Sequence, residues 1–305
     1  MSHIETTLGP RSAEQLGVVL PHEHVFVDLR VGDPPGFAQA EPEALIRLMG
    51  PELDRARGAG IGAIVEATPV GVGRRVDLLK AVSEATGFPL VVPTGIYREP
   101  WVPQWAHETS EEALCRWMYG ELTDQIEGTG IRAGWVKLST GDDGITSTEA
   151  KILRAAARAA AQVDAVIGSH TIRGSVVKDQ LGILEQVGHS PSRFIWIHAQ
   201  CEPDFALHLE MARWGVWIEY DDIGNVPDSV PIERIRRLLD ADLGHRVLLS
   251  QDRGWYDAAQ PGGGVPKPFT YIMETFVPAL RQAGIDERTI VQLTRTNPYQ
   301  AFSRA

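Results

Sequence analysis

The alternation of short apolar runs with longer amphipathic stretches constrains the fold of this 305-residue chain more than any other feature. Each run is nearly continuous over about five residues, which is typical of a parallel strand that is buried on both faces. Eight runs occur, at Gly17–Pro21, Gly62–Ala67, Pro89–Gly95, Ala133–Leu138, Ala165–Ser169, Phe194–His198, Val216–Tyr220 and Arg246–Ser250. Stretches with helical spacing lie between them, at Ala44–Gly58, Val76–Thr86, Ser110–Glu127, Thr148–Gln162, Val176–Val187, Phe205–Arg213 and Ile232–Ala241. This alternation predicts consecutive βα units and a parallel sheet.

Eight βα units in ~250 residues favour a closed (β/α)8 TIM barrel over an open doubly wound sheet. An open sheet normally has fewer strands and a glycine-rich, phosphate-binding turn after the first one. Here the first run is followed by His22, Glu23 and His24 instead. Because no linker or low-complexity tract divides the sequence, we expect one α/β domain over residues 1–305.

The charge and the cysteine content narrow the functional class. A net charge of −11 disfavours nucleic acid and anionic membranes as partners. The two cysteines, Cys115 and Cys201, lie far apart, so we expect no disulfide framework and a reducing, cytoplasmic location. The N-terminal residues lack the apolar segment of a secretory signal, and no apolar run approaches the ~20 residues of a membrane span.

Two features near the C-terminal end add local expectations. Asn297 followed by Pro298 has the pattern of a helix cap and a first-turn proline, which predicts a short last helix from that point. The glycine- and proline-rich segment 260–268 follows the eighth run. It is expected to form a long loop on the active-site face and is a candidate lid.

Side chains that bind metals lie at the ends of five of the predicted strands. His22 and His24 follow the first run, and their i, i+2 spacing places both on one face of an extended chain. The others, each at the end of its own run, are Lys137, His170, His198 and Asp252. A single histidine or aspartate of this kind is more often a hydrogen-bonded core or turn residue. Together they indicate a metal site, because the strands of a barrel deliver such residues to one rim. Imidazole and carboxylate ligands suit zinc, manganese, cobalt or iron.

The chain resembles the phosphotriesterase family of the amidohydrolase superfamily along nearly its whole length. Besides the ligand pattern, the resemblance extends over the acid-x-Thr and Gly-Arg elements of segment 66–79, Pro93–Tyr97 and Leu293–Pro298. It implies two divalent metal ions, most simply zinc, and a metal-bridging hydroxide as the nucleophile. By resemblance, His22, His24 and Asp252 bind the more buried ion, and His170 and His198 bind the other. The resemblance also implies that Lys137 is N6-carboxylated and bridges both ions, and that Asp252 is the catalytic residue that accepts the proton of the hydroxide.

The substrate depends on the loops around this site. Tyr97 matches a tyrosine that lies beside the metals in lactonase members, which favours a lactone or carboxylic ester, although simple packing explains it equally well. Where members specific for acyl-homoserine lactones have an arginine, this chain has Asp222. Asp221 and Asp222 would suit a hydroxylated substrate such as a sugar lactone. Further candidate contacts are Arg98 and Arg253 for an anionic group, and Trp101, Trp105 and Trp255 as pocket walls; solvated loop charge and plain packing are the alternatives.

Three functions are therefore compared: a binuclear metal hydrolase of lactones or carboxylic esters, a hydrolase of phosphotriesters or phosphate esters, and a non-catalytic barrel that binds a ligand. The intact ligand set favours the first two. The expected partner is a small-molecule ester or lactone, and because members of the family often dimerise, a homodimer is expected as well.

Overall fold

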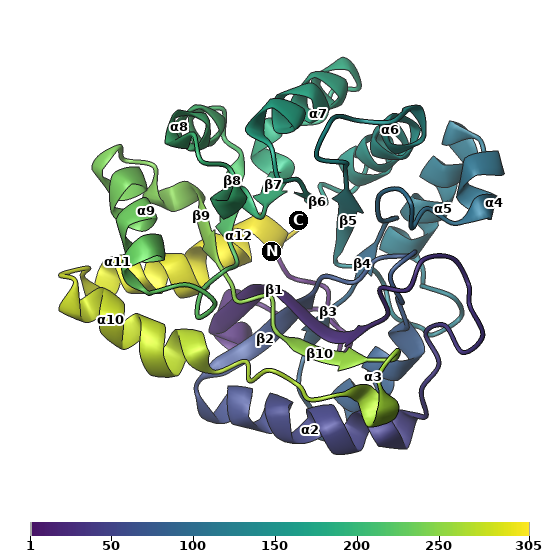
Figure 1. Ribbon diagram of the computed structural model, residues 1–305, viewed down its shortest axis with the longest axis horizontal. Coiled ribbons are helices and arrows are strands. Elements are labelled where there is room, and N and C mark those ends of the chain that lie inside the picture. The colour runs from purple at the N-terminus through teal and green to yellow at the C-terminus, as the bar shows by residue number, and fades with distance from the viewer. Residues whose placement is uncertain (1, 305) are drawn as a thin grey trace.

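The computed structural model describes residues 2–304, with strands at the centre and a ring of helices around them (Figure 1). The strands are β1 (Val18–Val27), β2 (Ile61–Glu66), β3 (Leu90–Val91), β4 (Pro93–Thr94), β5 (Trp135–Ser139), β6 (Ile167–His170), β7 (Phe194–Ile197), β8 (Trp217–Tyr220), β9 (Val247–Leu249) and β10 (Gly254–Asp257). The helices are α1 (Ala13–Leu16), α2 (Pro42–Gly58), α3 (Val76–Thr86), α4 (Gln104–Glu108), α5 (Glu111–Thr123), α6 (Ser147–Ala161), α7 (Gly174–Gln186), α8 (Phe205–Arg213), α9 (Ser229–Asp240), α10 (Val277–Gln282), α11 (Glu287–Val291) and α12 (Asn297–Phe302). The predicted TIM barrel is confirmed.

The strands form two parallel arcs rather than one uninterrupted ladder. One arc has the order β10-β1-β2-β3, and the other runs β4-β5-β6-β7-β8-β9. The third predicted run, 89–95, is divided at Val92 into β3 and β4, so the chain itself joins the arcs there. On the other side, within the described residues, no ladder pairs β9 with β1. The Ser250 hydroxyl lies 2.9 Å from both the backbone N and the backbone O of His22, and it bridges this seam between β9 and β1.

β1 is longer than predicted, because a strand that the sequence did not reveal pairs with its second half. The prediction ended the first strand at His22 and His24, whereas β1 continues to Val27 and both histidines lie inside it. β10 begins two residues after Asp252 and pairs with β1 in register, from His24 opposite Gly254 to Val27 opposite Asp257. The hydrogen bonds of this extra ladder keep β1 extended beyond the histidines.

A change of register in β1 turns the two histidines toward the barrel interior. Val19 belongs to the cluster of apolar side chains inside the barrel, whereas Leu20 packs in the layer between strands and helices. Strict alternation would therefore send His22 outward. The pairing with β2 shifts by one residue between Leu20 and Glu23, and an extra residue of this kind reverses the side-chain alternation beyond it.

The C-terminal segment is more continuous than predicted. Asn297 does not cap a new helix; π-helical residues Gln292–Thr296 join α11 to α12, so Asn297 lies within a continuous helical path. Its side-chain amide instead donates to the backbone O of Gly244 and of Val247, 2.8 Å from each. None of the helices in residues 2–304 has the length and apolarity to cross a membrane.

Candidate metal centre

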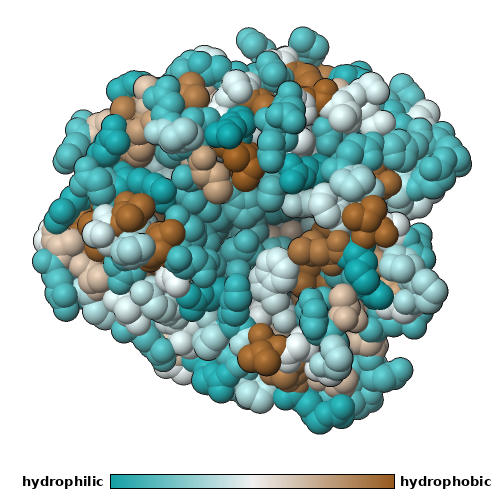
Figure 2. Space-filling view, in the orientation of Figure 1, coloured by the Kyte–Doolittle hydropathy of each residue, from teal (hydrophilic) through white to brown (hydrophobic). Residues whose placement is uncertain are grey.

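The structure gathers all six predicted metal-binding side chains around one cavity of about 180 Å³. They come from both arcs of the barrel: the two histidines from β1, Lys137 from β5, His170 from β6, His198 from just after β7 and Asp252 from just after β9. The face of the molecule seen in Figure 2 is hollowed at its centre, and apolar side chains gather along one edge of the hollow.

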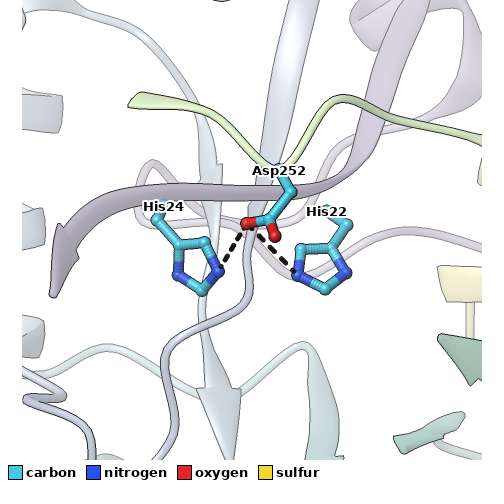
Figure 3. Close-up of side chains that lie close together, drawn as sticks. All are labelled: His22, His24 and Asp252. Carbon is cyan, nitrogen blue, oxygen red and sulfur yellow. Dashed lines mark ion pairs between the residues drawn. The ribbon is translucent and has the colours of Figure 1, made fainter. Parts of the chain in front are cut away.

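His22, His24 and Asp252 form the tightest group. Both imidazoles project from β1 toward the same side, and the carboxylate of Asp252 points between them (Figure 3). Oδ1 of Asp252 lies 3.2 Å from Nε2 of His24 and 4.0 Å from Nε2 of His22. Three ligand atoms converging at such distances can hold one metal ion.

His170 and His198 approach the same cavity from the second arc. Their rings are nearly perpendicular, with centroids 4.3 Å apart, and the His198 ring lies 5.1 Å from that of His22. His198 would face away if the chain stayed extended after β7, but its φ of 63° is left-handed and turns the ring inward. Asp252 is left-handed as well, with φ of 51°. Residues other than glycine adopt this region only when their surroundings enforce it, and they cluster at functional sites.

Each of the four histidines has its Nδ1 atom occupied by a protein group. His22 is 2.8 Å from Glu219, and His24 is 2.7 Å from the Thr68 hydroxyl. His198 is 2.7 Å from Asp221, and His170 is 3.2 Å from the Tyr97 hydroxyl. Such bonds fix the ring orientation and leave every Nε2 atom for another ligand, which is the usual arrangement around metal-binding histidines.

Lys137 is a charged residue in an otherwise apolar setting. Its side chain is only 2% exposed, and its burial lowers its pKa to about 8, although the nearby carboxylates of Glu219 and Asp221 oppose the shift. A lysine in this state exchanges its proton near neutral pH and is more often a neutral amine than a surface lysine is.

Asp252 is the group whose surroundings best suit a bound cation. Burial disfavours its charge, but the neighbouring His24 outweighs burial and lowers the pKa of Asp252 to about 2. Its Oδ1 atom is buried, and none of the described residues donates a hydrogen bond to it. A buried carboxylate oxygen without a donor, beside imidazoles with free Nε2 atoms, fits a divalent ion. The residues present therefore suit a metal centre.

The rest of the cavity wall is apolar. Beyond the six candidate ligands it consists of Val27, Leu29, Ala67, Val72, Tyr97 and Trp255. The Trp255 ring makes an edge contact with His24, with centroids 5.0 Å apart, and its Nε1 donates to the backbone O of Asp252. Besides the Trp255 indole N–H, the polar group of this wall is the Tyr97 hydroxyl; burial raises its pKa to about 12, so it stays protonated.

The charged residues suggested as substrate contacts have other partners. Arg98 forms an ion pair with Asp142 at 2.8 Å, and Arg253 donates to the backbone O of Gly224 and lies over the Tyr271 ring. Asp222 pairs with Arg234 of α9 at 3.0 Å. None of the three predicted contacts lines the cavity. Their partners belong to other parts of the chain, and a sequence pattern does not reveal such pairings.

Asp221 and Asp222 are neighbours with opposite surroundings, because consecutive residues at a strand end face opposite sides. Asp221 is fully buried, accepts the backbone N–H of His198 and is bonded by the Gln200 amide. The expectation that both carboxylates contact a hydroxylated substrate is therefore wrong for Asp221, which is enclosed beneath His198. A sugar lactone loses its support.

Trp101 and Trp105 line a different cavity, of about 480 Å³, between the loops that follow β1, β2 and β4. Trp101 of this cavity contacts Tyr97 of the candidate metal centre edge-on, with ring centroids 5.6 Å apart. Of the three tryptophans considered from the sequence, only Trp255 borders the candidate metal centre.

The sequence reasoning missed the residues that support the ligands. Two of them are Glu66, the last residue of β2, and Glu219 of β8. Both are fully buried, and burial raises the pKa of each carboxyl group. Glu66 accepts the backbone N–H groups of Val25 and Thr68. The available signal was the presence of acidic residues inside strongly apolar runs, where a charge needs a partner.

The chain is similar to known proteins along nearly its whole length. Among curated proteins, the phosphotriesterase homology protein of Escherichia coli is 29% identical over 295 residues, with 95% of this chain and 99% of that protein covered. Among solved structures, a mutant organophosphorus hydrolase from Deinococcus radiodurans matches with a TM-score of 0.86 and 32% identity, covering 98% and 97% of the two chains. A lactonase from Listeria monocytogenes matches with a TM-score of 0.85 and 26% identity over 98% of both. The model of the phosphotriesterase family, whose members have a binuclear divalent metal centre, matches residues 2–302, and the chain belongs to this family.

Proposed function

We propose that this chain is a binuclear metal-dependent hydrolase that opens a small, uncharged lactone or carboxylic ester. One observation carries the proposal: six metal-binding side chains share a cavity whose other walls are apolar. The similar proteins include an organophosphorus hydrolase and a lactonase, so ester bonds of both carbon and phosphorus are within the chemistry of the family.

The ligand assignment follows from the two groups described above. His22, His24 and Asp252 would hold one ion, and His170 and His198 the other. Lys137 lies in the same cavity, and its lowered pKa favours the neutral amine that reacts with carbon dioxide. We infer that Lys137 is N6-carboxylated and would be a ligand of both ions, for which zinc would suit these nitrogen and oxygen ligands. When bound, two such ions activate water near neutral pH and polarise the ester carbonyl.

The protein's own groups position the substrate and move the proton. Asp252 is ionised at neutral pH and lies at the centre of the site, so it can accept the proton released as water attacks. Leu29, Val72 and Trp255 would pack against the hydrocarbon part of the substrate and exclude bulk water. The Tyr97 hydroxyl holds the orientation of His170.

The cavity favours a neutral and small substrate. Among its described lining residues, Lys137 is the only lysine or arginine, and it is the proposed metal ligand. A phosphate monoester or another anion would therefore lack the guanidinium that usually binds it. A volume of about 180 Å³ also lies below the roughly 300–1,000 Å³ of pockets for drug-sized ligands. A compact lactone ring fits this space better than a phosphotriester with three substituents.

A substrate panel tests the proposal. The zinc-loaded protein would be assayed with aliphatic lactones of increasing chain length, simple carboxylic esters and a paraoxon-like triester, with a metal-free sample as the control. We expect kcat/KM to be highest for lactones and to vanish without metal. A faster reaction with the triester would favour the alternative, a phosphotriesterase. Lack of turnover with all three classes by protein that contains two metals per chain would favour the non-catalytic barrel.

A cytoplasmic location and a homodimer stay predictions. The first rests on the two unpaired cysteines, Cys115 and Cys201, and the second on the resemblance to the family. Fractionation and light scattering, respectively, would test them.

A further inference from the structure

Glu23, which lies between the two β1 histidines, has no role in the chemistry proposed above. All the hydrogen bonds that its carboxylate accepts nevertheless come from residues 250–253, the segment that carries Asp252. Oε2 of Glu23 accepts the backbone N–H of Arg253 at 2.7 Å. Oε1 accepts the backbone N–H and the side-chain amide of Gln251, each at 3.2 Å, and lies 2.9 Å from the Ser250 hydroxyl. Glu23 is fully buried, because the i, i+1 alternation turns it away from the cavity that its neighbours line.

These contacts surround a strained point of the backbone. Asp252 has a φ of 51°, a conformation that costs a residue with a side chain on the order of 1–3 kcal/mol unless the surroundings enforce it. The N–H groups immediately before and after Asp252, those of Gln251 and Arg253, both point to Glu23. Without this carboxylate two backbone donors beside Asp252 would lose their acceptor in a buried setting, which is unfavourable.

Gln251 extends the same support to the next segment of chain. Its side-chain amide also donates to the backbone O of Phe269 at 2.7 Å, and its Oε1 atom accepts the backbone N–H of Ile272 at 3.0 Å. Glu23 on β1 therefore contacts residues 250–253, and Gln251 links these residues to residues 269–272.

We propose that Glu23 is a positioning residue that holds the left-handed turn at Asp252, so that Oδ1 faces Nε2 of both His22 and His24. This rests on the proposed function in so far as Asp252 is a metal ligand. A glutamine at this position has nearly the same shape but carries one acceptor oxygen instead of two. It cannot accept from both backbone N–H groups, whichever way its amide is oriented.

Zinc affinity tests the proposal directly. The affinity of wild-type protein and Glu23→Gln would be measured by competition with a chromogenic chelator, alongside the thermal unfolding of each metal-free protein. We expect Glu23→Gln to remain folded and to bind the zinc ion of the His22–His24–Asp252 group about 10–100-fold more weakly, the usual effect of removing a group that supports a metal ligand. Ser83→Ala is the matched control, because Ser83 bonds to Thr7 and to the backbone O of Phe88 before β3, away from the centre. It should lower stability and leave zinc affinity unchanged.

A double-mutant cycle separates positioning from general stabilisation. If Glu23 acts through Asp252, then Glu23→Gln should have almost no further effect on zinc affinity once Asp252→Asn is present. Additive losses would overturn the proposal. If Glu23→Gln fails to fold, Gln251→Met removes one donor to Glu23 and both bonds to residues 269–272, and it is expected to weaken zinc binding several-fold; unchanged binding would overturn the proposal.

The outcome for the proposed function stays distinguishable. Wild-type protein that binds two zinc ions and hydrolyses lactones, with a Glu23→Gln variant that binds zinc equally well, would contradict only the role of Glu23. Wild-type protein that binds no zinc would overturn both.

Discussion

Replacing Lys137 by methionine should have opposite effects on the metal-free and the metal-loaded protein. The folded-state pKa of about 8 lies about 2.5 units below the ordinary value of 10.5. At 1.36 kcal/mol per unit, the buried ammonium therefore opposes folding by about 3 kcal/mol below pH 8. Because the folded pKa is lowered, this penalty is fully present at pH 7 and disappears as the pH rises from about 8 to 10.5. Methionine has a similar shape and no charge, so Lys137→Met should stabilise the metal-free chain at pH 7.

The expected shift in Tm follows from the size of the chain. An unfolding entropy of ~2.1 cal/mol/K per residue gives about 0.64 kcal/mol/K for 305 residues, so about 3 kcal/mol corresponds to a rise of about 5 °C. In the presence of zinc the same variant lacks the proposed shared ligand, and it should bind fewer than two ions and lose the stabilisation that zinc gives to the wild type. Scanning calorimetry with chelator and with zinc, together with elemental analysis, measures both effects.

A surface lysine provides the control. Lys178 pairs with Glu210 at 2.7 Å and is 38% exposed, so Lys178→Met should change stability by less than about 0.5 kcal/mol and leave the zinc response intact. A lower Tm for metal-free Lys137→Met would refute the argument that its charge is unfavourably buried. Full zinc binding by that variant would refute the assignment of Lys137 as a ligand.

Three further predictions concern other parts of the molecule. Burial lowers the pKa of His208 to about 4. The free energy of unfolding should therefore fall by up to about 3 kcal/mol as the pH falls from about 6.5 to 4. Urea unfolding of His208→Gln should show a smaller decrease in the free energy of unfolding over the same pH range. Gly95 has a φ of 114°, and a Cβ there would lie 2.1 Å from the backbone O of Lys137. Gly95→Ala should therefore lower the free energy of unfolding, measured with denaturant, by about 3 kcal/mol. A decrease below about 1 kcal/mol would contradict this close approach. Trp255→Ala opens one wall of the cavity and should raise kcat/KM for long-chain lactones relative to short ones about tenfold, whereas an unchanged chain-length preference would show that Trp255 does not limit the substrate.

The barrel could be predicted because its determinants are local. Apart from β10, the strands lie in short apolar runs and the helices between them are periodic stretches, so their order alone indicates eight βα units. The candidate ligands followed because the fold places the ends of parallel strands at one rim. The sequence pattern does not predict β10, because its four residues, Gly254–Asp257, form no apolar run. They are extended because they pair with β1.

The orientation of particular side chains depended on features that a sequence pattern does not reveal. The register change in β1 and the left-handed φ of His198 each reverse the face that simple alternation assigns. The partners of Arg98, Asp222 and Arg253 lie far away along the chain or in neighbouring loops, and they remove these residues from the cavity. Asp221 and Asp222 could have been separated from the sequence, because adjacent residues of a strand face opposite sides.

The division of the barrel into two arcs has a consequence for its dynamics. His22 and His24 belong to the arc that contains β1, whereas Lys137, His170 and His198 belong to the other arc. Between β9 and β1 the described backbone has no ladder, and side chains such as Ser250 hold the seam. Ions held by residues of both arcs would act there as a cross-link, in the place of missing backbone hydrogen bonds. Amide hydrogen exchange along β1 and β9 should then slow when the centre is occupied.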